Sequence, residues 1–249
     1  MKENLKAVAI NENSWYFSNA VGRAFLFKGS NSALLVDTTN GPGDLYGLIR
    51  ELVGNMPVVL INTHADSDHI GCNNQFRNTF MNPSEFAYYA TKSKKGDAIP
   101  LPIEEGDLID IGGRTFEIIE TPGHTYGSIS ILNRKERFLI GGDTILTKVF
   151  IFGPQRNLRA LIYSLKKLRD KYLGSFDMIY TSHFEMPLSS DFILEELSSA
   201  EALLDKRQVG TDPGSIPLEP PEYKPALLYK KGNSGFFAYA DLQNSNYIF

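Results

Sequence analysis

The residues best suited to chemistry are two histidines and two aspartates within six positions: His64, Asp66, Asp68 and His69. They directly follow the apolar run Pro57–Ile61, which is typical of a buried strand. Imidazole and carboxylate groups are ligands for divalent metals, and the end of a buried strand can present several of them together. The stretch therefore predicts a metal site at one end of a sheet.

The chain has four histidines, and the other two, His124 and His183, also follow strand-like segments. Asp143 does the same, after the apolar run Phe138–Ile140. A single histidine is more often a hydrogen-bonded core residue than a ligand, but four of four at strand ends, with aspartates beside them, favour metal binding. The one cysteine, Cys72, excludes a thiolate-rich zinc site, and imidazole with carboxylate suits Zn, Fe or Mn.

Hydrophobic periodicity predicts the elements that must position these side chains. Three short strands within residues 14–37 precede a helix from Asp44 to Val53, with Asp44 as its N-cap and Gly54 as its C-cap. A buried strand follows at 57–62. Strand, helix and strand in this order are typical of an α/β crossover unit.

Beyond this unit the pattern predicts both helices and hairpins. We expect a helix from His69 to about Phe80, and a second, short helix opened by Asn82–Glu85. The remaining expected elements are hairpins over 108–119 and 128–140, a surface helix over 157–173, a strand over 176–180, a helix over about 190–207, and a last hairpin over 226–239. Residues 209–223 are rich in Gly and Pro and are predicted to form a loop.

Composition narrows the class of protein. Hydrophobic residues make up 42% and charged residues 22%, as in an ordinary globular protein, and the net charge of −4 is spread along the chain. This balance argues against a nucleic-acid surface, and no apolar run is long enough to span a membrane or act as a signal peptide. With one cysteine, we expect a cytoplasmic protein with a small-molecule substrate and no nucleic-acid or membrane partner. A homodimer stays open.

The order of the candidate ligands resembles that of the metallo-β-lactamase superfamily over about residues 14–185. The matching positions are His64, Asp66, Asp68 and His69 in an H-x-D-x-D-H motif, His124 in T-P-G-H-T-Y-G-S, Asp143 in G-G-D-T, and His183. The resemblance implies an α/β fold, a four-layer αββα sandwich with two mixed sheets flanked by helices. It also implies one such domain over residues 1–249, whose second half is completed by a helix and hairpin within 186–249.

The resemblance further implies a dinuclear metal centre. Carried over by position, the ligands of one metal are His64, Asp66 and His124, those of the other are Asp68, His69 and His183, and Asp143 bridges the two. Asp68 and Asp143 are then the catalytic carboxylates. Two divalent ions are expected, with zinc favoured and iron or manganese as alternatives. A metal-bridging hydroxide would hydrolyse a small ester, thioester, lactone or phosphoester.

One residue departs from the resemblance, because the family's usual motif has His where this chain has Asp66. Four neutral His and three Asp carry a formal charge of −3, against −2 for the usual set, so the site should be a weaker Lewis acid and should tolerate Fe or Mn better. The flavo-diiron branch also has a carboxylate here. A di-iron oxidoreductase with a separate electron donor is therefore one alternative. Another is a non-catalytic binding protein in which Asp66 is too short to reach the metal.

Several residues near the ligands have two interpretations. Asp37 follows a predicted strand and either supports the site or caps a turn. Tyr126 and Phe184 lie next to ligands in the sequence and either line a substrate pocket or pack in the core. Thr125 and Ser128 are expected to support the neighbouring imidazole by hydrogen bonds. Cys72 is expected to be a small buried residue in a first helical turn.

Overall fold

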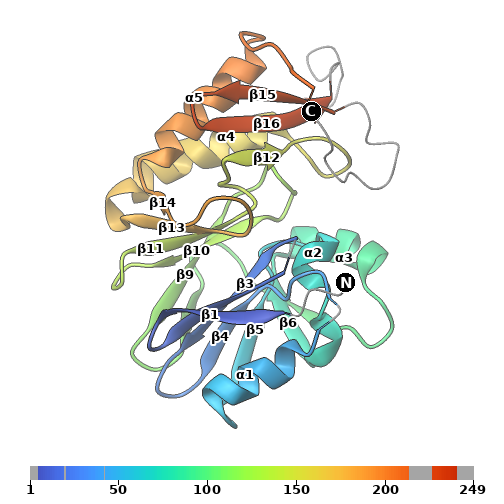
Figure 1. Cartoon of the computed structure of the whole chain (residues 1–249), viewed down its shortest axis with the longest axis vertical. Coiled ribbons are helices and arrows are strands. Elements are labelled where there is room, and N and C mark those ends of the chain that lie inside the picture. The colour runs from blue at the N-terminus through green and yellow to red at the C-terminus, as the bar shows by residue number, and fades with distance from the viewer. Residues whose placement is uncertain (1–4, 20, 42, 213–225, 240–249) are drawn as a thin grey trace. The chain divides into compact units, whose positions relative to one another are not determined.

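We analysed a computed structural model of the chain, which describes residues 5–19, 21–41, 43–212 and 226–239. By its internal packing the chain divides into two compact units (Figure 1). Unit 1 comprises Met1–Ile119 with Ile131–Glu136, and unit 2 comprises Glu120–Ser130 with Arg137–Phe249. Each unit combines mixed β-structure with helices, so the predicted α/β class is confirmed. That residues 1–249 form one domain stays a prediction.

Within its described residues, unit 1 contains a seven-stranded sheet whose strands follow one another in chain order (Figure 1). The strands are β1 (Lys6–Asn11), β2 (Ser14–Ser18), β3 (Arg23–Lys28), β4 (Ala33–Val36), β5 (Val58–Ile61), β6 (Asn78–Met81) and β7 (Ile99–Pro102). The first four pair antiparallel, and β4 to β7 pair parallel. The three strands expected within 14–37 and the crossover to the next strand are therefore confirmed, whereas β1, β6 and β7 were not predicted.

Helix α1 (Leu45–Val53) is the crossover connection between β4 and β5, and its ends are those that the sequence predicts. The Asp44 carboxylate accepts a hydrogen bond from the Gly47 backbone N–H at 2.8 Å, and Gly54 ends the helix with φ 61°. The buried side chains of α1 pack on the apolar face of β2 to β4. This packing holds the ends of β4 and β5 side by side, which is where the first candidate site residues follow.

The expected helix from His69 to about Phe80 is wrong. Helix α2 covers only Ser67–Ile70, a 3-10 turn η1 covers Asn73–Gln75, and β6 follows. The His69 carbonyl, which a continuing helix would use, instead accepts hydrogen bonds from the Thr38 backbone N–H and the Asn62 side chain. These contacts take the place of helical hydrogen bonds. Cys72 is buried as expected but lies outside the helix.

The rest of unit 1 agrees more closely with the sequence pattern. A 3-10 turn η2 (Pro83–Glu85) leads into α3 (Phe86–Lys92), and the side chain of Asn82 accepts a hydrogen bond from Ser84 N–H. Strands β8 (Leu108–Asp110) and β9 (Thr115–Glu120) form the predicted hairpin, in which Gly112 and Gly113 both have positive φ. Strand β10 (Ile129–Asn133) is also present, and its residues are divided between the two units.

The described residues of unit 2 include two groups of strands. In the first, β11 (Phe138–Gly142) pairs parallel with β13 (Met178–Thr181), which pairs antiparallel with β14 (Leu188–Ser189). In the second, the predicted C-terminal hairpin of β15 (Ala226–Lys231) and β16 (Ser234–Tyr239) is confirmed, and β16 also pairs parallel with β12 (Lys148–Phe150). Strand β12 was not predicted. Of the predicted loop 209–223, residues 213–223 lie outside the described residues.

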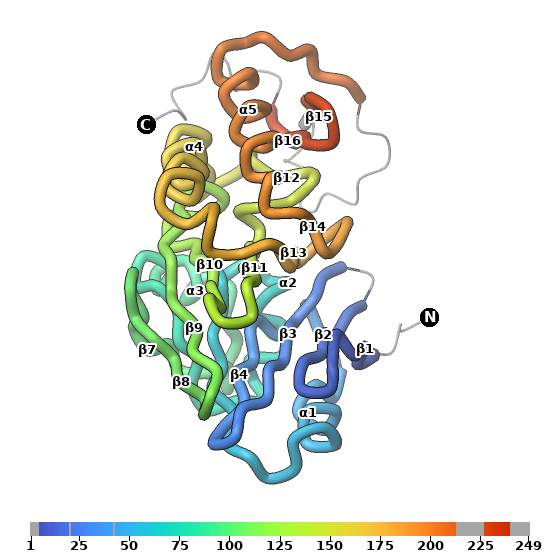
Figure 2. Tube along the Cα trace, turned by 90° about the vertical axis from the view of Figure 1, so that its left-hand side faces the viewer, coloured from blue at the N-terminus to red at the C-terminus, as the bar shows by residue number. Residues whose placement is uncertain are grey.

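Two helices of unit 2 lie side by side, as Figure 1 and Figure 2 both show. Helix α4 (Leu158–Lys167) begins at Asn157, whose side chain accepts from Ala160 N–H, and continues into a π-helical turn η3 (Leu168–Tyr172) and a 3-10 turn η4 (Leu173–Ser175). Helix α5 (Phe192–Leu204) is the second. In the described part of the chain, no helix combines the length and the apolar character needed to cross a membrane.

Candidate metal-binding site

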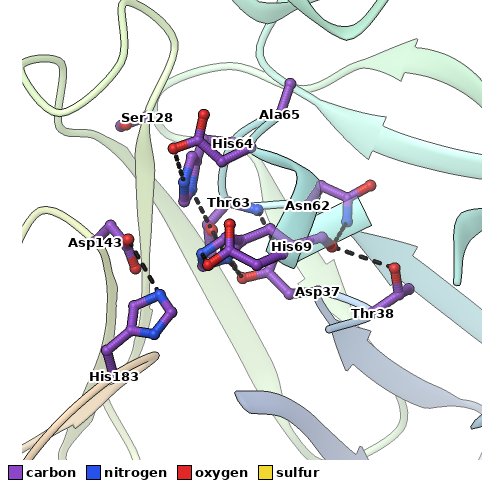
Figure 3. A network of polar contacts seen from close by, with 12 residues as sticks. Asp37, Thr38, Asn62, Thr63, His64, Ala65, His69, Ser128, Asp143 and His183 are labelled. Atoms are coloured by element: carbon purple, nitrogen blue, oxygen red, sulfur yellow. Dashed lines mark hydrogen bonds and ion pairs between the residues drawn. The ribbon is translucent and has the colours of Figure 1, made fainter. Parts of the chain in front are cut away.

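Unit 1 brings four of the seven predicted ligands together where β5 ends and α2 begins; Figure 3 shows two of them, His64 and His69. His64 Nε2 lies 3.4 Å from Asp66 Oδ2, and His69 Nε2 lies 3.9 Å from Asp68 Oδ2. The two imidazole rings have centroids 3.9 Å apart. Both histidines are buried, while the two carboxylates are partly exposed. The site therefore offers each imidazole a carboxylate neighbour.

Asp37 contacts one of these predicted ligands directly, which favours a supporting role over a turn cap. It follows β4, is fully buried and has φ 62°, a left-handed conformation that Asp tolerates better than most residues. Its carboxylate accepts three hydrogen bonds of 2.8 Å, from the backbone N–H of Thr63, from the Thr63 hydroxyl and from His69 Nδ1 (Figure 3). The last of these leaves His69 Nε2 with its lone pair.

The Thr63 hydroxyl orients the other imidazole of unit 1. It donates its one proton to Asp37 Oδ2, so its oxygen accepts from His64 Nδ1 at 3.0 Å. His64 Nε2 is then the ring nitrogen with the lone pair, as in His69. A histidine whose Nδ1–H is held by an oxygen acceptor and whose Nε2 carries the lone pair is oriented as a metal ligand.

The η2–α3 segment holds the loop that carries the first two ligands. The carboxylate of Glu85, which is fully buried, accepts a hydrogen bond from the Ala65 backbone N–H at 2.8 Å. The Tyr88 hydroxyl donates to Asp66 Oδ1 at 2.8 Å. Neither Glu85 nor Tyr88 is a candidate site residue from the sequence. The signal that was available is the spacing of Glu85 and Tyr88, three residues apart on one helical face.

Unit 2 brings the other three predicted ligands together around one carboxylate oxygen. Asp143 Oδ2 lies 3.2 Å from His183 Nε2 and 3.7 Å from His124 Nε2, and the dashed line in Figure 3 marks the shorter contact. His124 Nδ1 donates to the backbone carbonyl of Phe150 in β12 at 3.0 Å. The guanidinium of Arg156, which can only donate, lies 3.3 Å from His124 Nε2 and confirms that this atom carries the lone pair.

The residues next to these ligands differ in part from the expectation. Thr125 and Ser128 hydrogen-bond to each other, with their hydroxyl oxygens 2.6 Å apart, and so close the turn after His124. The His124 imidazole instead donates to the Phe150 carbonyl, an acceptor that the sequence pattern does not predict because β12 itself is not predicted. Tyr126 is half exposed, which excludes the core-packing interpretation for it.

Phe184 has a strained backbone directly after a predicted ligand. Its φ is 55°, and for so bulky a residue this is a marked outlier. Its ring stacks on that of Phe150 with centroids 6.4 Å apart, and the Lys148 ammonium lies 5.2 Å from the ring centre. More than a third of the residue is exposed. Phe184 therefore combines packing with exposure, and a role in lining a pocket stays a prediction.

In each unit, one His–Asp pair has its donor atoms at about the separation expected of two ligands of one metal ion. Two ligands bound at about 2.0–2.2 Å to one tetrahedral ion are separated by roughly 3.3–3.6 Å. The distance from His64 Nε2 to Asp66 Oδ2 is 3.4 Å, and that from His183 Nε2 to Asp143 Oδ2 is 3.2 Å. The other two His–Asp pairs, at 3.9 Å and 3.7 Å, are somewhat further apart. That these seven residues are the ligands, Asp66 included, stays a prediction.

Comparison with known proteins identifies the family. The model of the metallo-beta-lactamase superfamily matches residues 20–183, which include all seven predicted ligands. The chain therefore belongs to the metallo-β-lactamase superfamily, as the order of its His and Asp residues predicts. Membership supports a metal-binding hydrolase.

Relatives and solved structures agree with this assignment. The chain is 32% identical over 214 residues to hydroxyacylglutathione hydrolase from Hahella chejuensis, covering 82% of this chain and 71% of that protein. It is 23% identical to acyl-coenzyme A thioesterase MBLAC2 from Gallus gallus, covering 70% and 76%. For two further curated relatives, the matched segments span only 61% and 53% of their length. Among solved structures, a metallo-beta-lactamase from Pontibacter korlensis matches 80% of this chain and 99% of its own, with TM-score 0.66 and 17% identity, which shows the shared fold.

Proposed function

We propose that this protein is a metal-dependent hydrolase of thioesters that carry an anionic group. The observation that supports it most is the shared orientation of three buried imidazoles. The Nδ1 atoms of His64, His69 and His124 are each held by an oxygen acceptor, and each Nε2 lies beside an Asp carboxylate. A protein has little reason to arrange buried imidazoles in this way unless they bind metal.

The ligand assignment follows the family's order of residues. We propose that His and Asp residues at the family's motif positions would hold two divalent ions. The residues are His64, Asp66, Asp68, His69, His124, Asp143 and His183. When bound, divalent metal supplies Lewis acidity and lowers the pKa of water to near neutral. The role of Asp37, Thr63 and the Phe150 carbonyl is to fix the imidazoles before any ion binds.

The substrate class is inferred from the relatives and from one cation. Hydroxyacylglutathione and acyl-coenzyme A, named in two relatives, are both thioesters with negatively charged groups. Arg156 lies 3.3 Å from His124 Nε2, so a guanidinium stands next to a predicted ligand. A guanidinium in this place can pair with a carboxylate or phosphate of a substrate.

Metal removal tests the proposal. Protein purified without chelators is expected to contain about two divalent ions per chain and to hydrolyse a hydroxyacyl-glutathione or acyl-coenzyme A thioester. Dialysis against a chelator should abolish the activity, and Zn²⁺, Fe²⁺ or Mn²⁺ should restore it. Elemental analysis and release of free thiol are the measurements. Fully metal-loaded protein that cleaves no thioester, ester, lactone or phosphodiester would contradict the proposal, and metal well below one ion per chain would favour a non-catalytic binding protein.

Asp66→His tests whether position 66 binds metal. If Asp66 is a ligand, the variant should keep two ions and shift its preference from iron or manganese toward zinc, because imidazole replaces a harder oxygen donor. The exposed Asp191→His, in unit 2, is the matched control and should leave metal content unchanged. A rise from one ion to two on Asp66→His would show that the native first site is deficient.

A di-iron oxidoreductase is the second candidate, favoured by the ligand-like distance of 3.4 Å between Asp66 Oδ2 and His64 Nε2. A carboxylate in this place makes the set of ligands richer in oxygen and better suited to iron. Iron-loaded protein with a reducing partner should then consume O₂. No oxidant consumption, together with thioester hydrolysis, would remove this candidate.

A further inference from the structure

We propose that Tyr88 is a positioning residue that makes Asp66 a one-oxygen metal ligand in this chain. The inference rests on the proposed function, because it requires that Asp66 bind metal. It concerns the residue at which the chain departs from the usual histidine. Asp66 replaces the usual histidine, and Tyr88 holds the Asp66 carboxylate in place.

The two oxygens of Asp66 have different surroundings. Oδ1 accepts a hydrogen bond from the Tyr88 hydroxyl at 2.8 Å, while Oδ2 lies 3.4 Å from His64 Nε2. The hydroxyl therefore occupies one oxygen and leaves the other at the distance expected between two ligands of one ion. A neutral O–H donor also withdraws charge from the carboxylate, which makes Asp66 a weaker donor than a free Asp.

Tyr88 is itself held in place. The Lys92 ammonium lies 5.3 Å from the centre of its ring, four residues further along α3, and the Thr91 hydroxyl donates to the Tyr88 carbonyl at 2.7 Å. The ring packs on a small apolar cluster that includes Ala65 and Ile70. A tyrosine with a fixed ring can direct its hydroxyl without a large loss of side-chain entropy at the time of metal binding.

A second contact from the same helical face points to the same role. Glu85 holds the Ala65 backbone N–H, and Tyr88, three residues later, holds the side chain of the next residue, Asp66. One short segment thus fixes both the main chain and the side chain at the ligand. An aspartate is shorter and has fewer built-in constraints than an imidazole, so its orientation depends more on such partners.

Tyr88→Phe tests the inference, since it keeps the ring and its packing but removes the hydroxyl. Loss of a hydrogen-bonding partner of a ligand typically weakens metal binding 10–100-fold, so we expect the first ion to bind about tenfold more weakly or worse and the second to be unchanged. Competition with a chromophoric chelator measures both affinities. Tyr89→Phe is the matched control, because its hydroxyl bonds Asn73 and Ala98 instead. It should lower Tm but leave both affinities unchanged.

A double-mutant cycle separates positioning from a general structural effect. In an Asp66→His background there is no carboxylate to hold, so adding Tyr88→Phe should change metal affinity less than twofold. An equal loss in both backgrounds would show that Tyr88 only supports the fold, and no loss in either would also overturn the inference. Native protein is measured first: if it binds no metal, the proposed function fails. If it binds two ions and Tyr88→Phe binds them equally well, only the role of Tyr88 fails.

Discussion

The two units hold their predicted ligands by different means. In unit 1 the four ligands fall within six positions, and side chains from other segments brace them, with the Asp37 carboxylate as the main acceptor. In unit 2 the three predicted ligands come from three separate segments, and the hydrogen bonds beside two of them involve backbone carbonyls. The Phe150 carbonyl accepts from the His124 imidazole, and the His183 carbonyl accepts from the Thr181 hydroxyl at 2.9 Å.

This difference has a consequence for mutation. A side-chain brace is removed by one substitution that leaves the chain path intact. A backbone brace is lost only when the chain itself moves, as when a residue is too large for its place. Substitutions that act on side chains should therefore damage the site of unit 1, and those that displace the main chain should damage the site of unit 2.

Gly123→Ala should lower the unfolding free energy most, because the added methyl group displaces the backbone of unit 2 next to His124. Gly123 has φ 146°, and a Cβ there would lie 2.4 Å from Leu161 Cα in α4. Overpacking and backbone strain together cost about 2–5 kcal/mol of unfolding free energy, measured by urea denaturation. Gly174→Ala in the same unit, where a Cβ would meet nothing within 4 Å, is the control. If Gly123→Ala lowers the unfolding free energy no more than the control does, the position of the backbone matters less in unit 2 than we infer.

Asp37→Ala should have the next largest effect, in unit 1. It leaves the buried donors of Thr63 and His69 without their acceptor, so unfolding free energy should fall by about 2–4 kcal/mol. Metal affinity should fall with it, because the His69 ring loses its orientation. Asp37→Asn keeps the shape and the tolerance of positive φ and should lose less. A loss below about 1 kcal/mol for Asp37→Ala would mean that side-chain braces are not what hold unit 1.

Glu196→Gln should change the unfolding free energy least, and it should raise it rather than lower it. Glu196 lies on α5 in unit 2 and is fully buried, and desolvation raises the pKa of its carboxyl group well above the usual value. A carboxyl group with a raised folded pKa stabilises the fold below its unfolded pKa of about 4.3 and loses that contribution as pH rises toward the folded value. Glutamine does not titrate. The variant should therefore match the native protein near pH 4 and exceed it by about 1 kcal/mol near pH 8; equal stability at both pH values would contradict this.

Much of the fold could be predicted because local signals and packing agree. The cap residues and the apolar face of helix α1 all lie within one segment, from Asp44 to Gly54. The short α2 could not be predicted in the same way. Its end depends on Thr38 and Asn62, whose hydrogen bonds to the His69 carbonyl join segments far apart in the sequence. Strand β12 is only three residues long and pairs with β16, almost ninety positions later.

The candidate site shows the same limit. The ligands were predictable because residue type and order identify them, and Asp37 was at least considered. The partners of the ligands were not, because a tyrosine such as Tyr88 in an apolar stretch looks like any packed aromatic residue until its hydroxyl meets Asp66. The Phe150 carbonyl carries no sequence signal at all, since every residue has one.

Strand β16, near the C-terminus, pairs with the strand whose carbonyl contacts the predicted ligand His124. Phe150, whose carbonyl holds His124, is paired with Phe237 in the β12–β16 register, and their rings stack with centroids 4.7 Å apart. A shortened protein ending at residue 185 would keep all seven predicted ligands and the whole segment that matches the family model. It would nevertheless leave β12 without its partner strand and the imidazole of His124 without a firmly placed acceptor. Residues beyond the last candidate ligand therefore help to place the acceptor of His124.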